Sequence, residues 1–259
     1  MGEQSKAHGD LPAVMLEGTY SPTNYVEEAV TLKGPDYTIT VNDGRIEVVF
    51  RTSEPLPDAD CRAAVRREVE RIFEARMVLS GQPWEMSGLT LKRHYPDGRK
   101  DVWVSATSLV AFASMPSPDV IITGSDGNIV SDTKAERQAA ERAFREQCLR
   151  HKEDSLLKDM MTSFRRAVDD PGDRMTHLYE IRDVLKHRFG GEKEAKRALG
   201  LTNSEWKDLG RIADQEPIEE SRHRGSHPSR RPATEEEQSR VFAVVRRMIR
   251  AYLDHLDHI

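Results

Sequence analysis

The sequence YTITVNDGRIEVVFR, residues 37–51, contains two runs of strand-forming residues on either side of a short polar turn. Tyr37–Val41 and Ile46–Arg51 are the runs, and Asn42-Asp43-Gly44 connects them. Asn and Gly tolerate the positive φ that tight hairpin turns need, so the triplet predicts an antiparallel hairpin. This hairpin indicates a β-rich first half of the chain.

Further strand patterns lie on both sides of the hairpin. They span Ala13–Glu17, Tyr25–Leu32, Leu89–Tyr95, Val102–Phe112 and Val120–Ile122. A single helix pattern interrupts them. Asp58 can cap its N-terminus, apolar residues follow at helical spacing, and Gly81 marks its end.

From Thr133 onward the apolar residues recur with the period of a helix. The expected helices are Thr133–Val168 (one long helix or a kinked pair), Met175–Phe189, Glu192–Leu199, Ser204–Ala213 and a last helix that Thr234 caps and that runs to Leu256. We therefore predict an α+β protein. Residues 1–130 form an N-terminal β-rich domain with one helix, and residues 131–259 form a C-terminal all-helical bundle.

Composition indicates a polar protein without a membrane span. Of the 259 residues, 32% are charged and 37% are hydrophobic, and the formal net charge is -5. This charge excludes a globally basic nucleic-acid coat but not a local basic site. Residues 1–12 lack the apolar core of a secretory signal, and no run approaches the roughly 20 apolar residues of a membrane span. With only Cys61 and Cys148, we expect a cytoplasmic protein with reduced thiols.

The residues most suggestive of chemistry lie in the polar segment before the last helix, which reads SRHRGSHPSRRP over residues 221–232. Imidazole and guanidinium groups are the side chains that hold a phosphate and move its proton. Arg222 and His227 fit the pattern R-x4-H, with His223 directly after the arginine.

Two other pairs fit the same pattern, Arg182 with His187 and Arg250 with His255. Residues five apart on a regular helix point about 140° away from each other. Both of these pairs fall inside expected helices, so their side chains diverge. Arg222 and His227 lie in a segment with Gly and Pro, where the two side chains can converge.

The Arg222–His227 motif and the helix order of residues 133–259 resemble the HEPN superfamily, whose helical bundles often act as metal-independent ribonucleases in bacterial defence and toxin systems. The resemblance implies that Arg222, His223 and His227 form the catalytic site. It also implies a homodimer in which two motifs face each other, and the stripe of Val241, Val244 and Met248 is the expected contact. The motif departs from the family pattern because Pro228 and a polar run place it ahead of the last helix. We take Glu180 as the acidic partner.

The chemistry of such a site needs no metal or cofactor, because RNA carries its own nucleophile in the 2′-OH. A histidine suits the proton transfers, and Arg222 suits the charge on the phosphate. The neighbouring cations Arg224, Arg230 and Arg231 are expected to attract the RNA backbone without reading its sequence. The pairs His223/His227 and His255/His258 lack a nearby third ligand, so we predict no metal site.

The residues leave a second function open. The same helical bundle is equally compatible with a non-catalytic interaction or sensor protein that binds a protein or nucleic acid, with the β-rich domain recognising a trigger or a neighbouring regulatory protein. Residues 195–209 also resemble a DNA-binding helix-turn-helix with Gly200 as the turn. Lys196, however, occupies a position that needs a small buried residue, and Trp206 is better explained as a core anchor.

Overall fold

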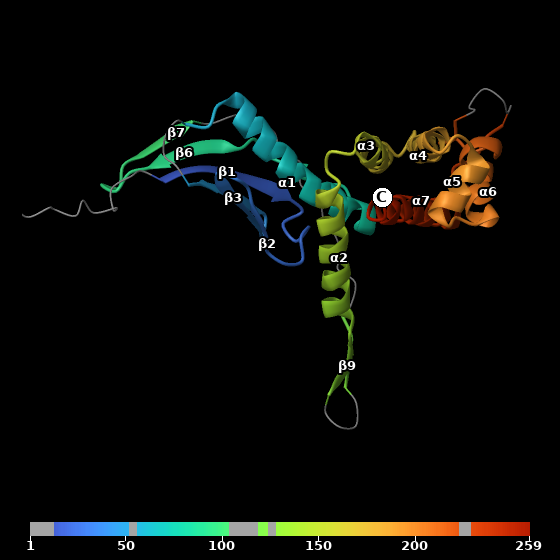
Figure 1. Cartoon of the computed structure of the whole chain (residues 1–259), viewed down its shortest axis with the longest axis horizontal. Coiled ribbons are helices and arrows are strands. Elements are labelled where there is room, and N and C mark those ends of the chain that lie inside the picture. Colours follow the sequence, from blue (N-terminus) through green and yellow to red (C-terminus); the bar gives the residue numbers. More distant parts are fainter. Residues whose placement is uncertain (1–12, 52–55, 104–118, 124–127, 223–228) are drawn as a thin grey trace, which may run out of the picture. The chain divides into compact units, whose positions relative to one another are not determined.

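The protein combines an antiparallel sheet with a set of helices, so the predicted α+β class is confirmed (Figure 1). The structure is a computed structural model that describes residues 13–51, 56–103, 119–123, 128–222 and 229–259. Contacts divide the chain into two compact units. The first unit comprises residues 1–73 and 84–139, and the second comprises residues 74–83 and 140–259.

The sheet of the first unit has the strand order β2-β3-β4-β1-β6-β7, and every neighbouring pair is antiparallel. A short strand, β5, also pairs with β1. The strands are β1 (Ala13–Ser21), β2 (Val30–Lys33), β3 (Tyr37–Asn42), β4 (Arg45–Phe50), β5 (Glu85–Met86), β6 (Thr90–His94) and β7 (Lys100–Trp103).

The predicted hairpin is the connection between β3 and β4. Val41 pairs with Ile46, and the turn residues Asp43 and Gly44 have φ values of 45° and 75°. These left-handed conformations are the ones that Asn, Asp and Gly accept with least strain. The hairpin prediction is therefore confirmed.

Helix α1 (Ala59–Ser80) lies across one face of this sheet (Figure 1). Asp58 caps it as predicted, since its carboxylate accepts a hydrogen bond of 2.7 Å from the backbone N–H of Cys61. Phe73 is fully buried, and its ring centroid lies 4.9 Å from those of both Tyr20 and Trp84. This aromatic cluster attaches the helix to the sheet.

One strand prediction needs correction, and one strand was not predicted. The strand expected over Tyr25–Leu32 begins only at Val30, because Tyr25 lies in a turn where its ring packs on Phe73. Strand β8 (Ile121–Thr123) forms a separate hairpin with β9 (Ile129–Asp132), a strand that the sequence analysis missed. The expected strand Val102–Phe112 overlaps β7 at Val102 and Trp103, and its remainder lies outside the described residues.

The helices of the second half follow the predicted order. They are α2 (Thr133–Arg150), α3 (Ser155–Asp169), α4 (Arg174–Arg188), α5 (Glu192–Leu199), α6 (Asn203–Gly210), the π-helical turn η1 (Arg211–Gln215) and α7 (Glu235–Leu256). The first expected helix is a pair, since the chain breaks between α2 and α3. Helix α7 contacts α3, α4, α5, α6 and η1, so it is the common partner of the helical unit.

The stripe of Val241, Val244 and Met248 on α7 is part of the core of its own helical unit. Val241 and Met248 are fully buried, and Val244 is nearly so. The expectation that this stripe forms a dimer contact is wrong, because these side chains already pack against helices of the same chain. The apolar period of a core helix and of an interface helix is the same, so the sequence did not distinguish them.

No helix within the described ranges combines the length and apolar character of a membrane span. Cys61 and Cys148 are both free thiols. Burial raises the pKa of Cys148 to about 12, which keeps this thiol protonated and unreactive at neutral pH.

The end of α1 belongs to the helical unit and is fixed there by side chains of α2 and α7. Glu141 of α2 is buried between two arginines: it pairs with Arg76 of α1 and, at 3.8 Å, with Arg145. The guanidinium of Arg246 on α7 donates a hydrogen bond of 2.6 Å to the backbone carbonyl of Val78. A cation at this position satisfies the negative end of α1, whose own last turn holds no basic residue.

We predict that Glu141→Gln destabilises the helical unit by about 3 kcal/mol, because it removes a carboxylate charge that lies between two largely buried guanidinium groups. Urea unfolding followed by circular dichroism measures this change. Glu236→Gln is the matched control, since Glu236 pairs with Arg240 on the exposed face of α7 and its loss should cost less than about 0.5 kcal/mol. Equal effects of the two substitutions would contradict the importance of the buried pair.

Candidate functional site

The segment that carries the predicted site is tied to the helical unit at both of its described ends. On one side, the N–H of Arg222 donates to the carbonyl of Ala213 in η1, at 3.2 Å. On the other, Ile218 and Arg231 form an isolated parallel bridge. The predicted catalytic residues His223 and His227 and the predicted RNA contact Arg224 lie outside the described residues. The site is therefore built here from Arg222 and its surroundings.

Arg222 lies on the surface of α4. Its Nη1 is 2.7 Å from Oδ2 of Asp183, and its guanidinium carbon is 5.4 Å from the centre of the Tyr179 ring. The arginine side chain stays 48% exposed and that of Asp183 41% exposed. A guanidinium held between a carboxylate and a ring face is oriented, and it still reaches solvent.

Tyr179 and Asp183 were not predicted as site residues. They are four positions apart on α4 and therefore lie on the same helix face. That spacing is visible in the sequence, but the sequence does not reveal that Arg222 packs on this face. Burial raises the pKa of the Tyr179 hydroxyl, so this ring acts as a neutral platform at physiological pH.

Glu180, the predicted acidic partner, makes different contacts. Its carboxylate accepts a hydrogen bond of 3.0 Å from the Ser163 hydroxyl on α3 and lies 3.4 Å from Nδ1 of His177. The carboxylate that contacts Arg222 is Asp183, three residues further along α4.

Arg182 also contacts the Tyr179 ring, but its guanidinium is largely enclosed within the helical unit. Its guanidinium lies 5.0 Å from the Tyr179 ring centre and 5.1 Å from that of Trp206, and the group is 3.7 Å from the carboxylate of Glu192. Its Nη1 lies so close to Gly210 that an added Cβ would be 2.7 Å from it. His187, the second residue of that R-x4-H match, is exposed in the last turn of α4.

The other match, Arg250 with His255, is also separated on its helix. The guanidinium of Arg250 lies 5.7 Å from the centre of the Phe144 ring, whereas the imidazole of His255 packs against Phe189 at 5.2 Å. The structure thus places the members of both helical matches in different surroundings, as helix geometry predicts.

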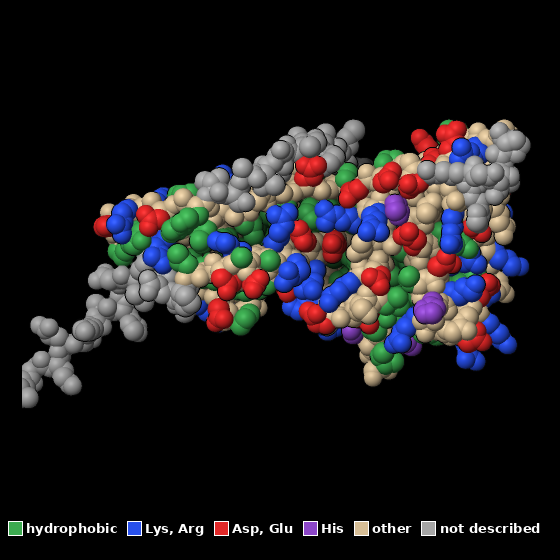
Figure 2. Space-filling view, turned by 90° about the horizontal axis from the view of Figure 1, so that it is seen from above, with side chains coloured by type: hydrophobic (Ala, Val, Ile, Leu, Met, Phe, Trp, Pro, Cys, Tyr) green, Lys and Arg blue, Asp and Glu red, His purple; other side chains and the backbone are tan. Residues whose placement is uncertain are grey.

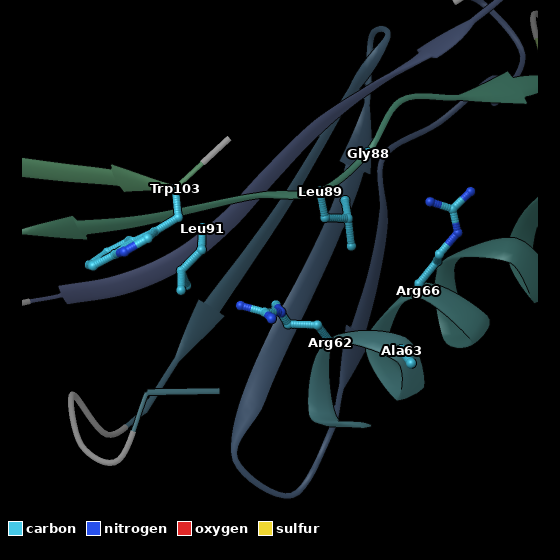
Figure 3. Close-up of a pocket in the computed structure, with 7 residues that line it drawn as sticks. All are labelled: Arg62, Ala63, Arg66, Gly88, Leu89, Leu91 and Trp103. Carbon is cyan, nitrogen blue, oxygen red and sulfur yellow. The ribbon is translucent and has the colours of Figure 1, made fainter. Parts of the chain in front are cut away.

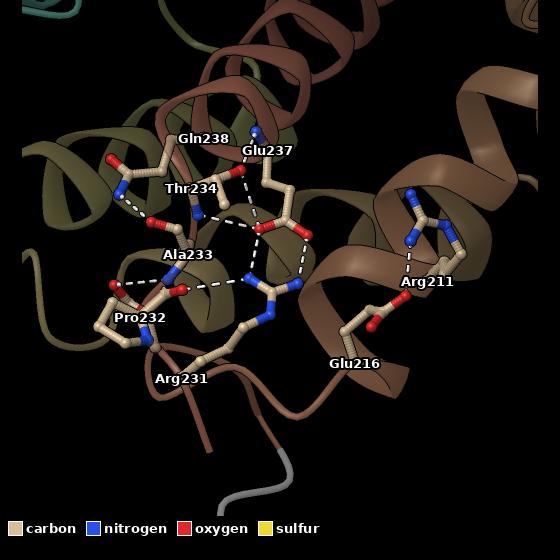
Figure 4. Close-up of polar contacts among 9 residues, drawn as sticks. Arg211, Glu216, Arg231, Pro232, Ala233, Thr234, Glu237 and Gln238 are labelled. Atoms are coloured by element: carbon tan, nitrogen blue, oxygen red, sulfur yellow. Dashed lines mark hydrogen bonds and ion pairs between the residues drawn. The ribbon is translucent and has the colours of Figure 1, made fainter.

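Arg231, a predicted RNA contact, is engaged at the start of α7 (Figure 4). Its two terminal nitrogens each lie 2.7 Å from a carboxylate oxygen of Glu237. Glu237 also forms a reciprocal capping box with Thr234, which satisfies backbone N–H groups at the helix N-terminus. Arg230 is exposed, and its side chain forms no ion pair within the part of the chain that the structure describes.

The surface charge is mixed. On the face seen in Figure 2, Lys and Arg side chains are interspersed with Asp and Glu, in line with the net charge of -5. Attraction of a polyanion must therefore come from local groups, because the protein as a whole repels it.

The helix-turn-helix interpretation concerns α5, Gly200 and α6. Gly200 adopts the left-handed conformation with φ of 60°, and Trp206 is fully buried, as expected. Lys196 lies between the two helices, where its ammonium contacts Glu192 at 2.7 Å and Asn203 at 2.6 Å. These contacts explain how a lysine is accommodated at a position where a small residue was expected.

Among the described residues, no group of three or more His, Cys, Asp and Glu side chains is arranged to hold a metal ion. Comparison with known protein families, with curated proteins and with solved structures finds no match for this chain. The candidate site therefore depends on its own geometry.

We predict that Arg222 and Asp183 contribute little to stability as a pair. Both groups are more than two-fifths exposed, and ion pairs at such positions contribute about 0.2–1 kcal/mol. A double-mutant cycle of Arg222→Gln and Asp183→Asn, measured by urea unfolding, should give a coupling energy within that range. A coupling well above about 1 kcal/mol would identify the pair as a structural tie.

Stability should fall in acid through Glu237. Its pairing with Arg231 lowers the pKa of this carboxyl from 4.5 to about 2 in the folded protein. The stabilisation is therefore complete above about pH 4.5 and is lost as the pH falls toward 2. Urea midpoints measured across this window should converge for the wild type and Glu237→Gln at the acidic end. A difference that stays constant with pH would contradict the low pKa.

Proposed function

We propose that the helical unit is a metal-independent endoribonuclease whose site comprises Arg222 and His227, with His223 as a second imidazole. The observation that supports the proposal is the orientation and exposure of the Arg222 side chain. Its guanidinium is oriented by Asp183 and Tyr179 and remains half exposed. An oriented and accessible guanidinium is what a phosphate ligand requires.

The contacts of Arg222 leave it able to bind an anion. Within the described residues, only Nη1 has an ion-pair partner, the carboxylate of Asp183. The remaining N–H groups of the fork can donate to two oxygens of one phosphate, which a lysine ammonium cannot reproduce. Asp183 thus serves as a positioning residue, because it restricts the rotation of the side chain that meets the phosphate.

The proposed reaction is transesterification within the RNA. The 2′-oxygen attacks the adjacent phosphorus and the bond to the 5′-oxygen breaks. One imidazole takes the proton of the 2′-OH, the other supplies a proton to the leaving 5′-oxygen, and Arg222 stabilises the extra negative charge on the phosphate. The products are a 2′,3′-cyclic phosphate and a 5′-hydroxyl.

The contact between Arg222 and α4 is also compatible with a second, non-catalytic function. If Arg222 only ties the segment to α4, the helical unit is a non-catalytic interaction module and the first unit recognises a trigger or partner. The exposure of the Arg222–Asp183 pair argues against a strong tie, since surface ion pairs contribute little. A homodimer remains part of the ribonuclease proposal, but its contact must lie outside the stripe of Val241, Val244 and Met248, which is buried within the unit.

We predict that His227→Ala lowers the rate of RNA cleavage by at least about a hundredfold, because it removes a proton-transfer group. Arg222→Lys should lose about as much, because a point charge replaces a planar fork on the phosphate. Cleavage of a labelled oligoribonucleotide, followed in a metal chelator, measures both changes, and the products should carry cyclic phosphate ends.

Arg250→Lys and His255→Ala form the matched control, since this pair has the same spacing on the regular helix α7. It should retain cleavage. Melting temperatures of all variants separate loss of chemistry from loss of folding. A wild-type protein that cleaves no RNA, or a His227→Ala variant that unfolds, would replace the ribonuclease with the interaction module.

A further inference from the structure

The first unit contains a hollow of about 440 Å³ between α1 and the edge of the sheet (Figure 3). Its walls come from the first turns of α1, from Gly88 and Leu89 just before β6, and from strands β6 and β7. The residues that matter for its chemistry are Arg62, Arg66, Leu89, Leu91 and Trp103. Hollows of this size are typical of sites for small organic ligands.

Trp103 stands at the end of a cross-strand row of apolar residues. The backbone register places Leu16 of β1 opposite Leu91 of β6, and Leu91 opposite Trp103 of β7. The exposed fraction rises along this row from 0% at Leu16 through 4% at Leu91 to 44% at Trp103. Helix α1 therefore covers the inner positions but leaves the indole accessible at the sheet edge.

The helix side of the hollow supplies two cations. Arg62 and Arg66 are four residues apart, so they project from successive turns on the same side of α1. Figure 3 shows Arg62 extending from the helix toward the strand residues. Arg66 uses its Nε to contact Glu70 at 2.9 Å, whereas Arg62 has no ion pair among the residues that the structure describes.

Glu70 offsets the charge of Arg66, whereas the charge of Arg62 is not offset within the hollow, since its described lining includes no carboxylate. The combination of an exposed indole with nearby guanidinium groups suits a ligand with a planar body and an anionic group. An indole ring stacks on a nucleobase, and guanidinium groups bind phosphate in a fork.

We propose that this hollow binds a nucleoside phosphate, with the base against Trp103 and the phosphate held by Arg62. The ligand is either a free nucleotide or the phosphorylated end of a single strand, which present the same chemistry. The proposal is independent of RNA cleavage in the helical unit, because it uses residues of the first unit alone.

Tryptophan fluorescence gives a local readout of this site. Trp84 and Trp206 are buried, with exposed fractions of 4% and 0%, so Trp103 is the tryptophan that a dissolved ligand can reach. Titration of the full chain with AMP should quench its emission in a saturable way. Adenosine and inorganic phosphate, the two halves of the probe, should each bind at least about tenfold more weakly than AMP.

Two variants test the contacts. Arg62→Gln should weaken AMP binding about tenfold through the loss of a charge-assisted hydrogen bond. Trp103→Leu, followed by calorimetry because the reporter is gone, should weaken it by a similar factor through the loss of stacking. Arg67→Gln is the matched control, since Arg67 is an exposed arginine on the same helix, and it should bind AMP as the wild type does.

A 5′-phosphorylated tetraribonucleotide distinguishes the two sources. If this oligonucleotide binds more tightly than AMP, and Arg62→Gln weakens its binding as well, the site takes the end of a strand. If it binds more weakly than AMP, the site takes a free nucleotide. His227→Ala should leave AMP binding unchanged, so failure of the ribonuclease proposal does not affect this test. Absence of quenching by millimolar AMP, equal binding of inorganic phosphate, or equal affinities of Arg62→Gln and Arg67→Gln would overturn the proposal.

Discussion

The candidate site depends on a cation that is largely enclosed in the helical unit. This cation is Arg182, whose planar guanidinium can lie against aromatic rings and pair with a carboxylate at the same time. Its charge is offset by Glu192 and by the ring faces of Tyr179 and Trp206, which fixes α4 against α5 and α6. The absence of a side chain at Gly210 allows the guanidinium to approach α6 closely. Because α4 is held in this way, Tyr179 and Asp183 present a defined surface to Arg222.

The arginines of this chain look alike in the sequence, and their partners set their roles. Arg182 and Arg231 have structural roles. The first packs between aromatic rings, and the second pairs with the carboxylate of a capping box. Arg222 has a carboxylate partner but stays accessible. Arg62 lines the same hollow as the indole of Trp103, with no ion pair in the part of the chain described. A cluster of arginines in a sequence therefore gives only an upper limit on the cations available to a ligand.

Features that depend on a few neighbouring residues were predictable from the sequence. The turn at Asn42–Gly44, the cap at Asp58 and the capping box at Thr234 follow from local conformational preferences and hydrogen bonds. The contact between Arg222 and Asp183 joins residues 39 positions apart, and no local pattern encodes it. The buried stripe of α7 shows the same limit, because an apolar period indicates that a face is covered but not which chain covers it.

The two proposed sites pair a guanidinium with an aromatic ring but differ in their charge balance. At Arg222 the neighbouring Asp183 offsets part of the positive field, so ground-state attraction for a phosphate is weak in a protein with net charge -5. Weak attraction is compatible with catalysis, because a catalytic arginine needs to stabilise charge that develops in the transition state. In the hollow beside Trp103 no carboxylate among the described lining residues opposes Arg62, so the field there favours a bound anion at equilibrium. The charged neighbours therefore support catalysis as the proposed role of the Arg222 site and ligand binding as the proposed role of the hollow beside Trp103.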